Sequence, residues 1–316
     1  MTQFDYFKSY YMITSRCNLD CTYCVLEDAP DQLRQELDLE GKKALIAHLY
    51  ALGCRRLTLS GGEALLIGKK PPTDFMALLD FLSRFRSLDP RDNLGVAVYS
   101  NGTRLTEAVA DAMRGIVDEV SLTIDSTSDD TLTRIGRNRG TYQNYLQNAV
   151  GAASQLGRVG IPIKLHTVVA QFNAASIASE VVDILDAVER SGGRLDKWKF
   201  YQYMSYDDAP RDRSHAIDKS VFDQVRLGIT AALAGRTIDL HFKDNAEMNG
   251  SLFNILPYGN AQFMHAGDSW TTSRRTRDLR SYATLAELFR ETGIDPTKFN
   301  KFHGLPMPSG SGQEAK

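Results

Sequence analysis

Three cysteines within eight residues constrain this chain more than any other feature of its sequence. Cys17, Cys21 and Cys24 stand four and three residues apart, so one short loop can direct all three sulfurs at one point. Thiolates select zinc, copper(I) or iron–sulfur clusters. Structural zinc normally takes four protein ligands, and a four-iron cubane is normally held by four cysteines. With three cysteines, a cubane keeps one iron free for a small chelating molecule. A zinc- or cluster-binding regulatory module is the non-enzymatic alternative.

Composition excludes several classes of function. The 316 residues carry a formal net charge of -2, with 24% charged and 42% hydrophobic residues, which is an ordinary profile for a globular protein. Without a basic excess, polymeric nucleic acid is not the expected partner. No apolar run approaches the roughly 18 residues that cross a membrane, so we expect no membrane partner. The clustered cysteines and the absence of a visible signal peptide favour a cytoplasmic location.

Strand-like and helix-like segments alternate six times. The expected strands cover residues 10–14, 56–60, 95–100, 119–124, 161–170 and 198–203, and the expected helices cover 37–52, 74–85, 106–113, 141–156, 174–190 and 221–234. Repeated strand–helix units indicate parallel strands with helices outside, which is an α/β fold. Polar residues recur at the C-terminal ends of the strands, so we predict a partial TIM-like (β/α)6 barrel.

The rest of the chain predicts the domain organisation. We assign residues 1–236 to the barrel. The pattern then becomes irregular, and we assign residues 237–308 to a C-terminal extension that covers the barrel mouth and closes the substrate site. The Gly/Ser/Lys-rich residues 309–316 predict a disordered tail.

A second motif, Gly61-Gly62-Glu63, directly follows the second expected strand. Glycine lets a backbone approach a ligand closely, and the Glu63 carboxylate can accept a hydrogen bond from an ammonium group. Cys54 precedes the same strand, which places it at the opposite end of the barrel from the catalytic face. We therefore interpret Cys54 as a buried structural thiol and not as a fourth cluster ligand.

The Cys-x3-Cys-x2-Cys spacing, with Tyr23 before the last cysteine and Gly-Gly-Glu one strand–helix unit later, resembles the radical S-adenosylmethionine (radical SAM) superfamily. The resemblance implies a 4Fe–4S cluster on the three cysteines and SAM on the open iron. It implies cleavage of SAM to a 5′-deoxyadenosyl radical that abstracts a substrate hydrogen, and an electron donor such as flavodoxin or ferredoxin. The expected SAM-binding residues are Tyr23, Gly61, Gly62, Glu63, Ser100, Asn101, Thr123 and Arg137.

Within the superfamily the chain resembles the viperin family, which dehydrates the ribose of a nucleoside triphosphate. Matching runs include Ser60–Glu63, Ser100–Gly102, Lys164–Val168, Trp198–Lys199 and Met248–Tyr258. The resemblance implies a nucleotide or nucleoside substrate whose phosphates contact inward basic residues. The expected substrate-binding residues are Arg56, Ser60, Lys164, His166, Lys197 and Lys199.

The chain departs from the viperin pattern at the sugar. Tyr10 and His166 stand where viperins have asparagine, and Leu252 stands near their tyrosine beside the reacting sugar. We assign Tyr10 and His166 to catalysis. His166 is a general base or hydrogen-bond donor to the sugar, or a structural histidine; Tyr10 is a hydrogen-atom donor, or packs in the core. Viperin's Gly/Lys-rich phosphate loop is replaced by residues 268–280, with three arginines as stand-ins, Arg274, Arg275 and Arg277.

These patterns predict a radical SAM enzyme that abstracts a ribose hydrogen from a nucleotide or nucleoside. The product is a 3′,4′-didehydro nucleotide, as in viperin, or another ribose edit such as epimerisation in nucleoside natural-product biosynthesis. The alternative is radical modification of a peptide or another small molecule.

Overall fold

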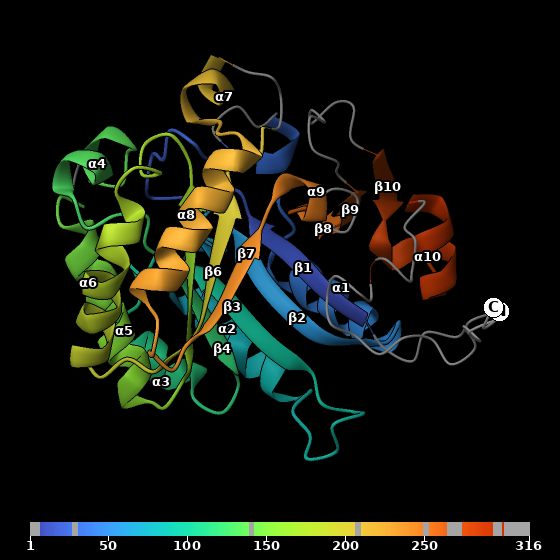
Figure 1. The fold of residues 1–316 in the computed structure, drawn as a ribbon. Helices are drawn as coiled ribbons and strands as arrows, with labels where there is room; N and C mark the ends of the chain where they lie inside the picture. Colours follow the sequence, from blue (N-terminus) through green and yellow to red (C-terminus); the bar gives the residue numbers. More distant parts are fainter. Residues whose placement is uncertain are drawn as a thin grey trace, which may run out of the picture.

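Parallel strands that follow their order in the sequence form the centre of the fold (Figure 1). The computed structural model describes residues 7–26, 31–138, 142–205, 210–248, 253–263, 274–292 and 299. Across these residues β1 to β7 pair in parallel, each with the next. Their bounds are β1 (Phe7–Thr14), β2 (Cys54–Gly61), β3 (Gly95–Ser100), β4 (Glu119–Thr123), β5 (Ile163–Val169), β6 (Leu195–Gln202) and β7 (Asp239–Lys243).

Helices cover the outer face of this curved sheet (Figure 1). In α6 (Ile177–Arg190) buried residues recur every three or four positions, which turns one stripe of the helix toward the core. The outward strand residues, such as Leu57, Val98 and Leu122, are fully buried and belong to the same hydrophobic cluster. Each such side chain contributes about 1.5–3 kcal/mol on burial. The other helices are α1 (Leu39–Ala51), α2 (Thr73–Ser83), α3 (Glu107–Met113), α4 (Asp129–Arg134), α5 (Tyr145–Arg158), α7 (Pro210–His215), α8 (Lys219–Ala232), α9 (Asn245–Met248) and α10 (Leu285–Thr292).

The sheet is an open, partial barrel, as predicted. Its described part ends at β7 on one side and at β10 on the other. The alternation from residue 10 to residue 234 is confirmed, with shifts of a few residues at the boundaries. The sequence did not predict β7, which pairs with β6 and carries the parallel sheet past residue 236.

The later strands of the expected extension join the sheet at β1. Strand β8 (Phe253–Ile255) pairs in parallel with β1, and β9 (Asn260–Phe263) and β10 (Arg274–Asp278) follow in antiparallel order. Whether the extension covers the barrel mouth remains a prediction. Residues 249–252, 264–273 and 309–316 lie outside the described residues, and the predictions about Leu252 and the tail fall there.

None of the helices in the described ranges has the length and hydrophobicity that crossing a bilayer requires.

Candidate active site

The cysteine loop, residues 15–26, begins where β1 ends. Its three cysteines are free thiols; Cys17 is exposed and the other two are half-buried. Burial raises the pKa of the Cys17 thiol and raises that of Cys21 to about 12, and the other thiolates of the loop add to both shifts. The backbone N–H groups of Leu19 and Leu26 donate to the Sγ atoms of Cys17 and Cys24, each at 3.4 Å. The loop therefore brings the three sulfurs within electrostatic reach of one another.

The Gly-Gly-Glu motif fastens the cysteine loop to β2. The N–H of Gly62 donates to the carbonyl of Thr14 at 3.0 Å, and the N–H of Glu63 donates to that of Arg16 at 2.8 Å. A Cβ on Gly62 would lie 2.3 Å from the Arg16 carbonyl oxygen. Glycine is thus needed here for the approach of the loop's own backbone, and the predicted approach of a ligand stays a prediction.

The Glu63 side chain holds the end of β3. It is fully buried, and its carboxylate accepts from the Ser100 hydroxyl at 2.9 Å and from the Asn101 N–H at 2.7 Å. Asn101 in turn donates through Nδ2 to Asn18 at 3.0 Å and to Cys17 Sγ at 3.8 Å. The predicted contact between Glu63 and the SAM ammonium group stays a prediction; in the structure both carboxylate oxygens bind β3.

A buried network joins β4 to the cysteine loop. Arg137, only 5% exposed, forms an ion pair with Asp125 at 2.8 Å and donates to the hydroxyl groups of Tyr23 and Tyr145. Tyr23 donates to the same Asp125 carboxylate at 2.5 Å. The Tyr145 hydroxyl donates to the Thr123 carbonyl. The Arg137 guanidinium is directed at Asp125 and fixes Tyr23, and its predicted contact with SAM stays a prediction.

Backbone contacts reinforce this network. The N–H groups of Asp20 and Thr22 donate to the carbonyls of Gly136 and Ile135, at 3.4 and 3.0 Å. Gly136 has φ +82, and a Cβ there would lie 1.8 Å from the Asp20 carbonyl oxygen. The C-terminal ends of β1 to β4 thus converge on the cysteine loop, as expected for the functional face of a barrel.

Inside the barrel, the strands carry a layer of cations nearer their N-terminal ends. Lys8 of β1 pairs in register with Arg56 of β2, and Lys164 of β5 pairs with Lys197 of β6. Lys199 lies two residues further along β6. We call Lys8, Arg56, Lys164, Lys197 and Lys199 the basic layer. All of them except Lys8 were predicted to bind substrate.

The lysines of the basic layer differ in their partners. Lys164 forms an ion pair with Glu119 at 2.5 Å, and Lys197 lies 3.6 Å from Asp239. Burial, reinforced by neighbouring cations, lowers the pKa of Lys8 to about 7 and that of Lys199 to about 8. Within the described ranges, no carboxylate lies within ion-pair distance of Lys8, Arg56 or Lys199.

A layer of rings separates the basic layer from the cysteine loop. Tyr10, Tyr99, His166 and Tyr201 form it, with centroids 6.1, 4.6 and 5.2 Å apart in that order. Burial lowers the pKa of His166 well below its usual range, so the imidazole is neutral. Its Nε2 atom is buried and has no hydrogen-bond partner among the described residues. A buried polar atom of this kind is satisfied when a ligand supplies the partner.

The other predicted residues of this region have local partners. The Ser60 hydroxyl donates to the Tyr11 carbonyl at 3.2 Å, across the β1–β2 pair. Arg277 forms ion pairs with Glu287 and Glu291 of α10, so it supports the extension. The side chains of Arg274 and Arg275 lie outside the described residues, and their predicted phosphate contacts stay predictions. Cys54 is 1% exposed, which confirms the buried thiol.

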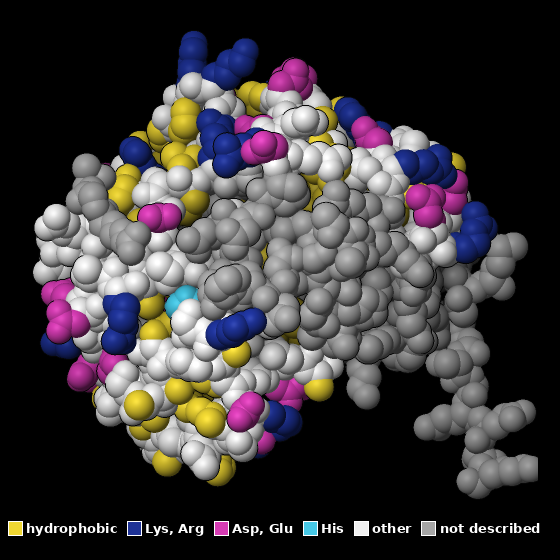
Figure 2. All heavy atoms as spheres, turned by 90° about the horizontal axis from the view of Figure 1, so that it is seen from above, with side chains coloured by type: hydrophobic (Ala, Val, Ile, Leu, Met, Phe, Trp, Pro, Cys, Tyr) yellow, Lys and Arg dark blue, Asp and Glu magenta, His cyan; other side chains and the backbone are white. Residues whose placement is uncertain are grey.

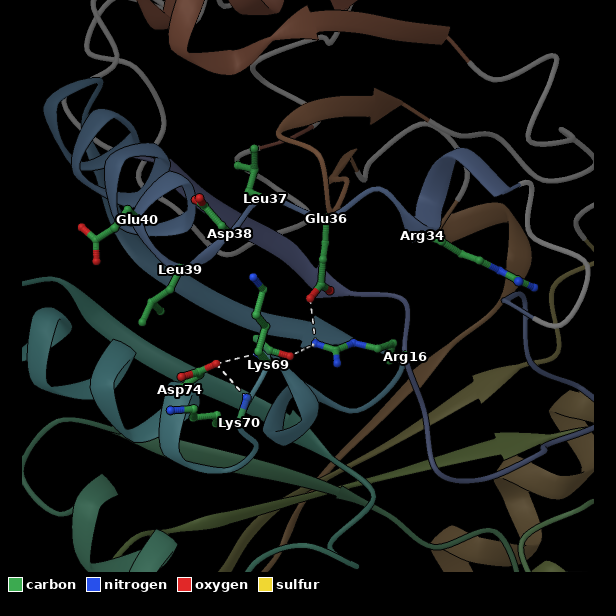
Figure 3. A pocket seen from close by; sticks show the side chains of 11 residues that line it. Arg16, Arg34, Glu36, Leu37, Asp38, Leu39, Glu40, Lys69, Lys70 and Asp74 are labelled. Atoms are coloured by element: carbon green, nitrogen blue, oxygen red, sulfur yellow. Dashed lines mark hydrogen bonds and ion pairs between the residues drawn. The ribbon is translucent and has the colours of Figure 1, made fainter.

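On the outer side, a groove of about 650 Å³ runs beside the start of the cysteine loop (Figure 3). Arg16, which directly precedes Cys17, reaches into it. Its guanidinium forms an ion pair with Glu36 and donates to the Gly68 carbonyl, both at 2.7 Å. These contacts anchor the loop from outside, while Asn101 and Arg137 hold it from within.

The face seen in Figure 2 carries basic and acidic side chains interspersed over its described part, without one continuous basic patch.

A model of the radical SAM superfamily matches residues 11–169, which contain the cysteine loop, the Gly-Gly-Glu motif and strands β2 to β5. The chain belongs to the radical SAM superfamily.

Curated relatives within this superfamily act on different substrates. The chain is 31% identical over 155 residues to a GTP 3′,8-cyclase of Chlorobaculum tepidum, which covers 49% of this chain and 42% of the cyclase. It is 29% identical over 157 residues, half of each chain, to an S-adenosylmethionine-dependent nucleotide dehydratase of a Thermoplasmatales archaeon. It is 30% identical over 173 residues to the PqqA peptide cyclase of Rhizobium meliloti, and this match covers 54% of this chain and 42% of that enzyme. The matches thus span half or less of these relatives.

Solved structures of the superfamily share the fold. The peptide-bound and S-adenosylmethionine-bound anSMEcpe superposes with a TM-score of 0.66 at 15% identity, over 92% of this chain and 82% of that one. Streptococcus suis SuiB bound to its precursor peptide SuiA gives the same TM-score at 12% identity, over 96% and 67%. At this identity the likeness shows the radical SAM partial barrel alone.

Membership of the superfamily confirms the predicted cofactors, a 4Fe–4S cluster and SAM, and the donor set fits the cluster. Cys17, Cys21 and Cys24 lie close enough to interact electrostatically, so as thiolates they need cations to neutralise them. N–H donors to sulfur are typical around cluster ligands. Across the described ranges, no group of three His, Cys, Asp or Glu side chains is arranged for a single metal ion. A 4Fe–4S cluster does not require three side chains to converge on one ion, because each thiolate would bind a separate iron. Cys17, Cys21 and Cys24 would hold it.

The sequence did not single out several residues that the structure places beside the predicted ones. Lys8 lies two residues before the predicted Tyr10 on β1, and Tyr201 lies two residues after the predicted Lys199 on β6. Tyr99 lies two residues before the predicted Asn101. Counting by twos along each strand from Tyr10 and Lys199 would have found Lys8 and Tyr201. Asp125 and Tyr145 carried no such signal, because their roles depend on how β4 and α5 pack around Arg137.

Proposed function

We propose that this radical SAM protein abstracts a hydrogen atom from the ribose of a phosphorylated nucleoside and so modifies the sugar. The observation that carries the proposal is the basic layer inside the barrel. Keeping Lys8 and Lys199 partly buried without carboxylate partners is costly, and an anionic ligand removes that cost. Relatives named GTP 3′,8-cyclase and nucleotide dehydratase support a nucleotide.

The depth of the two layers fits such a substrate. From Lys8 to Tyr10 is two residues along β1, which is about 7 Å at the rise of a strand. Phosphate bound by Lys8, Arg56 and Lys199 would therefore put the attached sugar among the rings of Tyr10 and His166. The C-terminal ends of the strands, where SAM would lie, come next.

Each residue has a role in this arrangement. The cluster on the three cysteines supplies, when bound, the electron that cleaves SAM to the radical that takes the ribose hydrogen. Asp125 and Arg137 fix Tyr23 and with it the cysteine loop, while Glu63 fixes Asn101. The neutral His166 offers its unpartnered Nε2 to a sugar hydroxyl, either as hydrogen-bond partner or as general base. The packed rings around it exclude water from the sugar.

The fate of the substrate radical follows from residues that differ from viperin. By the resemblance to viperin, Tyr10 and His166 stand where that family has asparagine, and Leu252 stands near its tyrosine beside the sugar. We favour a ribose edit such as epimerisation over dehydration to a 3′,4′-didehydro nucleotide. A product that has lost water supports dehydration, and a product of unchanged mass supports epimerisation.

Deuterium transfer tests the proposal. The reconstituted protein is incubated without oxygen with SAM, a one-electron reductant and ribose-deuterated nucleotides. A flavodoxin or ferredoxin is the expected natural reductant. Deuterium in 5′-deoxyadenosine from one nucleotide is the expected result. Its absence from all nucleotides and nucleosides, with SAM still cleaved, overturns the proposal. A Cys17→Ala variant that forms no 5′-deoxyadenosine controls for cleavage by the reductant alone.

Peptide modification is the second candidate. The PqqA peptide cyclase is 30% identical to this chain over 173 residues, and the solved structures that share the fold include peptide complexes. The basic layer argues for an anionic ligand, so a peptide substrate would have to be acidic. Deuterium transfer from a peptide and none from any nucleotide would favour this candidate.

A further inference from the structure

Glu119 brings a carboxylate into contact with the basic layer; the nearby Asp118 is paired with Arg86. Glu119 is the first residue of β4, and its Oε1 atom lies 2.5 Å from Lys164 Nζ. Its side chain is 30% exposed, and it lines a small cavity together with Lys8 and Arg56. A carboxylate is unexpected where the surrounding strands supply cations for an anionic substrate. Its position therefore needs a reason.

Glu119 interacts with lysines on three other strands, β5, β6 and β1. Burial alone would raise its pKa, but Lys164, Lys197 and Lys8 outweigh burial and lower the pKa below its usual range. The group is therefore ionised at neutral pH. Its charge also reaches Lys199, whose pKa it raises against the effect of burial. The Glu119 charge thus reduces the positive electrostatic potential that would attract a substrate phosphate.

The remaining charge limits what can bind. Glu119 neutralises Lys164, and Asp239 lies beside Lys197. On the described inner face this leaves Lys8, Arg56 and Lys199 for a ligand. A phosphate monoester carries about −1.5 to −2 charges at pH 7, and each further phosphoryl group adds another negative charge. Three cations match a mono- or diphosphate, whereas a triphosphate would bring an uncompensated charge next to the partly buried Glu119 carboxylate.

We infer that Glu119 sets the number of phosphates, so that the protein takes a nucleoside mono- or diphosphate and discriminates against the triphosphate. The inference rests on the proposed function, because it concerns the anionic end of that substrate. Glu119 acts as a resident anion that keeps Lys164 occupied and repels a third phosphoryl group. Specificity of this kind comes from a repulsive element as much as from attractive contacts.

Binding of a phosphate series tests the inference. Cluster-loaded, SAM-bound protein is titrated without oxygen and without added divalent cations with the mono-, di- and triphosphates of each ribonucleoside. For the preferred base, the triphosphate should bind about tenfold more weakly than the mono- or diphosphate. In Glu119→Gln, Lys164 is released and the repulsion is gone, so triphosphate affinity should rise by about tenfold, the gain from one charged hydrogen bond. Monophosphate affinity should change less than triphosphate affinity.

Two further variants make the result specific. Glu40→Gln removes the same charge from α1, where Glu40 is 80% exposed and pairs with Lys43, and should leave the series unchanged. Glu119→Asp keeps the charge on a shorter side chain and should keep the discrimination, which matters if Glu119→Gln folds poorly.

Three outcomes would overturn the inference: tightest binding of the triphosphate by the unmodified protein, an equal shift of all three ligands in Glu119→Gln, or the same shift in Glu40→Gln. With deuterium transfer intact, these outcomes leave the proposed function standing. If no nucleotide binds and none gives deuterium transfer, the proposed function itself fails.

Discussion

At the scale of single residues, the basic layer gives the most direct test of substrate binding. Lys199 has no carboxylate partner among the described residues, and burial lowers its pKa to about 8. Replacing it with methionine keeps its packing and removes the charge. We expect Lys199→Met to weaken nucleotide binding by about ten- to a hundredfold, since a charged hydrogen bond contributes about 1.5–3 kcal/mol.

The control for this variant is Lys219→Met on α8, whose side chain is 57% exposed and pairs with Asp223. Titration of loaded protein with nucleotide measures both. Equal affinities of the two variants would mean that Lys199 does not contact the anion.

Lys8 predicts how nucleotide binding depends on pH. Its pKa is lowered to about 7 by burial first, and then by Lys164, Arg56 and Lys199, while Glu119 acts in the opposite direction. The charged amine that attracts phosphate is therefore present below pH 7 and is lost as the pH rises through 7 to 8. A phosphate monoester gains its second charge near pH 6. Affinity should therefore be highest between about pH 6 and 7 and fall above that range.

Isothermal titration at several pH values measures this dependence. In Lys8→Met the fall between pH 7 and 8 should become shallower, with the remaining slope due to Lys199. A slope that is the same in the variant and in the unmodified protein would contradict the role of Lys8.

At the scale of elements, the turn after α4 holds the cysteine loop in place. A Cβ on Gly136 would lie 1.8 Å from the Asp20 carbonyl, so Gly136→Ala must displace the loop. Gly160→Ala is a matched control, because Gly160 has φ +74 but nothing within 4 Å of the added atom. Both variants carry the same backbone strain, and only the first touches the loop. We expect Gly136→Ala to hold clearly less iron and sulfide per chain after anaerobic reconstitution than Gly160→Ala.

Iron and sulfide analysis, with thermal unfolding to confirm folding, separates the two cases. Equal cluster content in both variants would show that the turn does not support the loop.

The elements themselves were largely predictable. Alternating strands and amphipathic helices gave the parallel barrel, and the spacing of Cys17, Cys21 and Cys24 gave the cluster loop. The partners of buried charges were not predictable. Arg137 and Glu63 carry charges that suit a ligand, yet the fold pairs them with Asp125 and with the end of β3. Such pairing depends on which strands become neighbours, and that information is not local in the sequence.

At the scale of the whole molecule, the two ends of the barrel have different supports. The cysteine loop depends on contacts from the C-terminal ends of β1 to β4, whereas the basic layer is fixed within the strands by ladder hydrogen bonds. Loss of the cluster would remove the group that ties Cys17, Cys21 and Cys24 together and should loosen the loop. The parallel strands below keep their register, because their outer faces pack in the core beneath the helices.

Removal of iron should therefore affect ligand binding at the cysteine-loop end of the barrel and leave binding at the basic layer almost unchanged. Anaerobic treatment with a chelator should abolish SAM binding, because its expected ligand is the open iron. Nucleotide affinity should stay within about threefold, a change of about 0.6 kcal/mol. Parallel titrations of loaded and stripped protein with SAM and with nucleotide provide the measurement. If stripping also removes nucleotide binding, the loop and the basic layer form one cooperative site, and the substrate is held by the cysteine end of the barrel as well as by its strands.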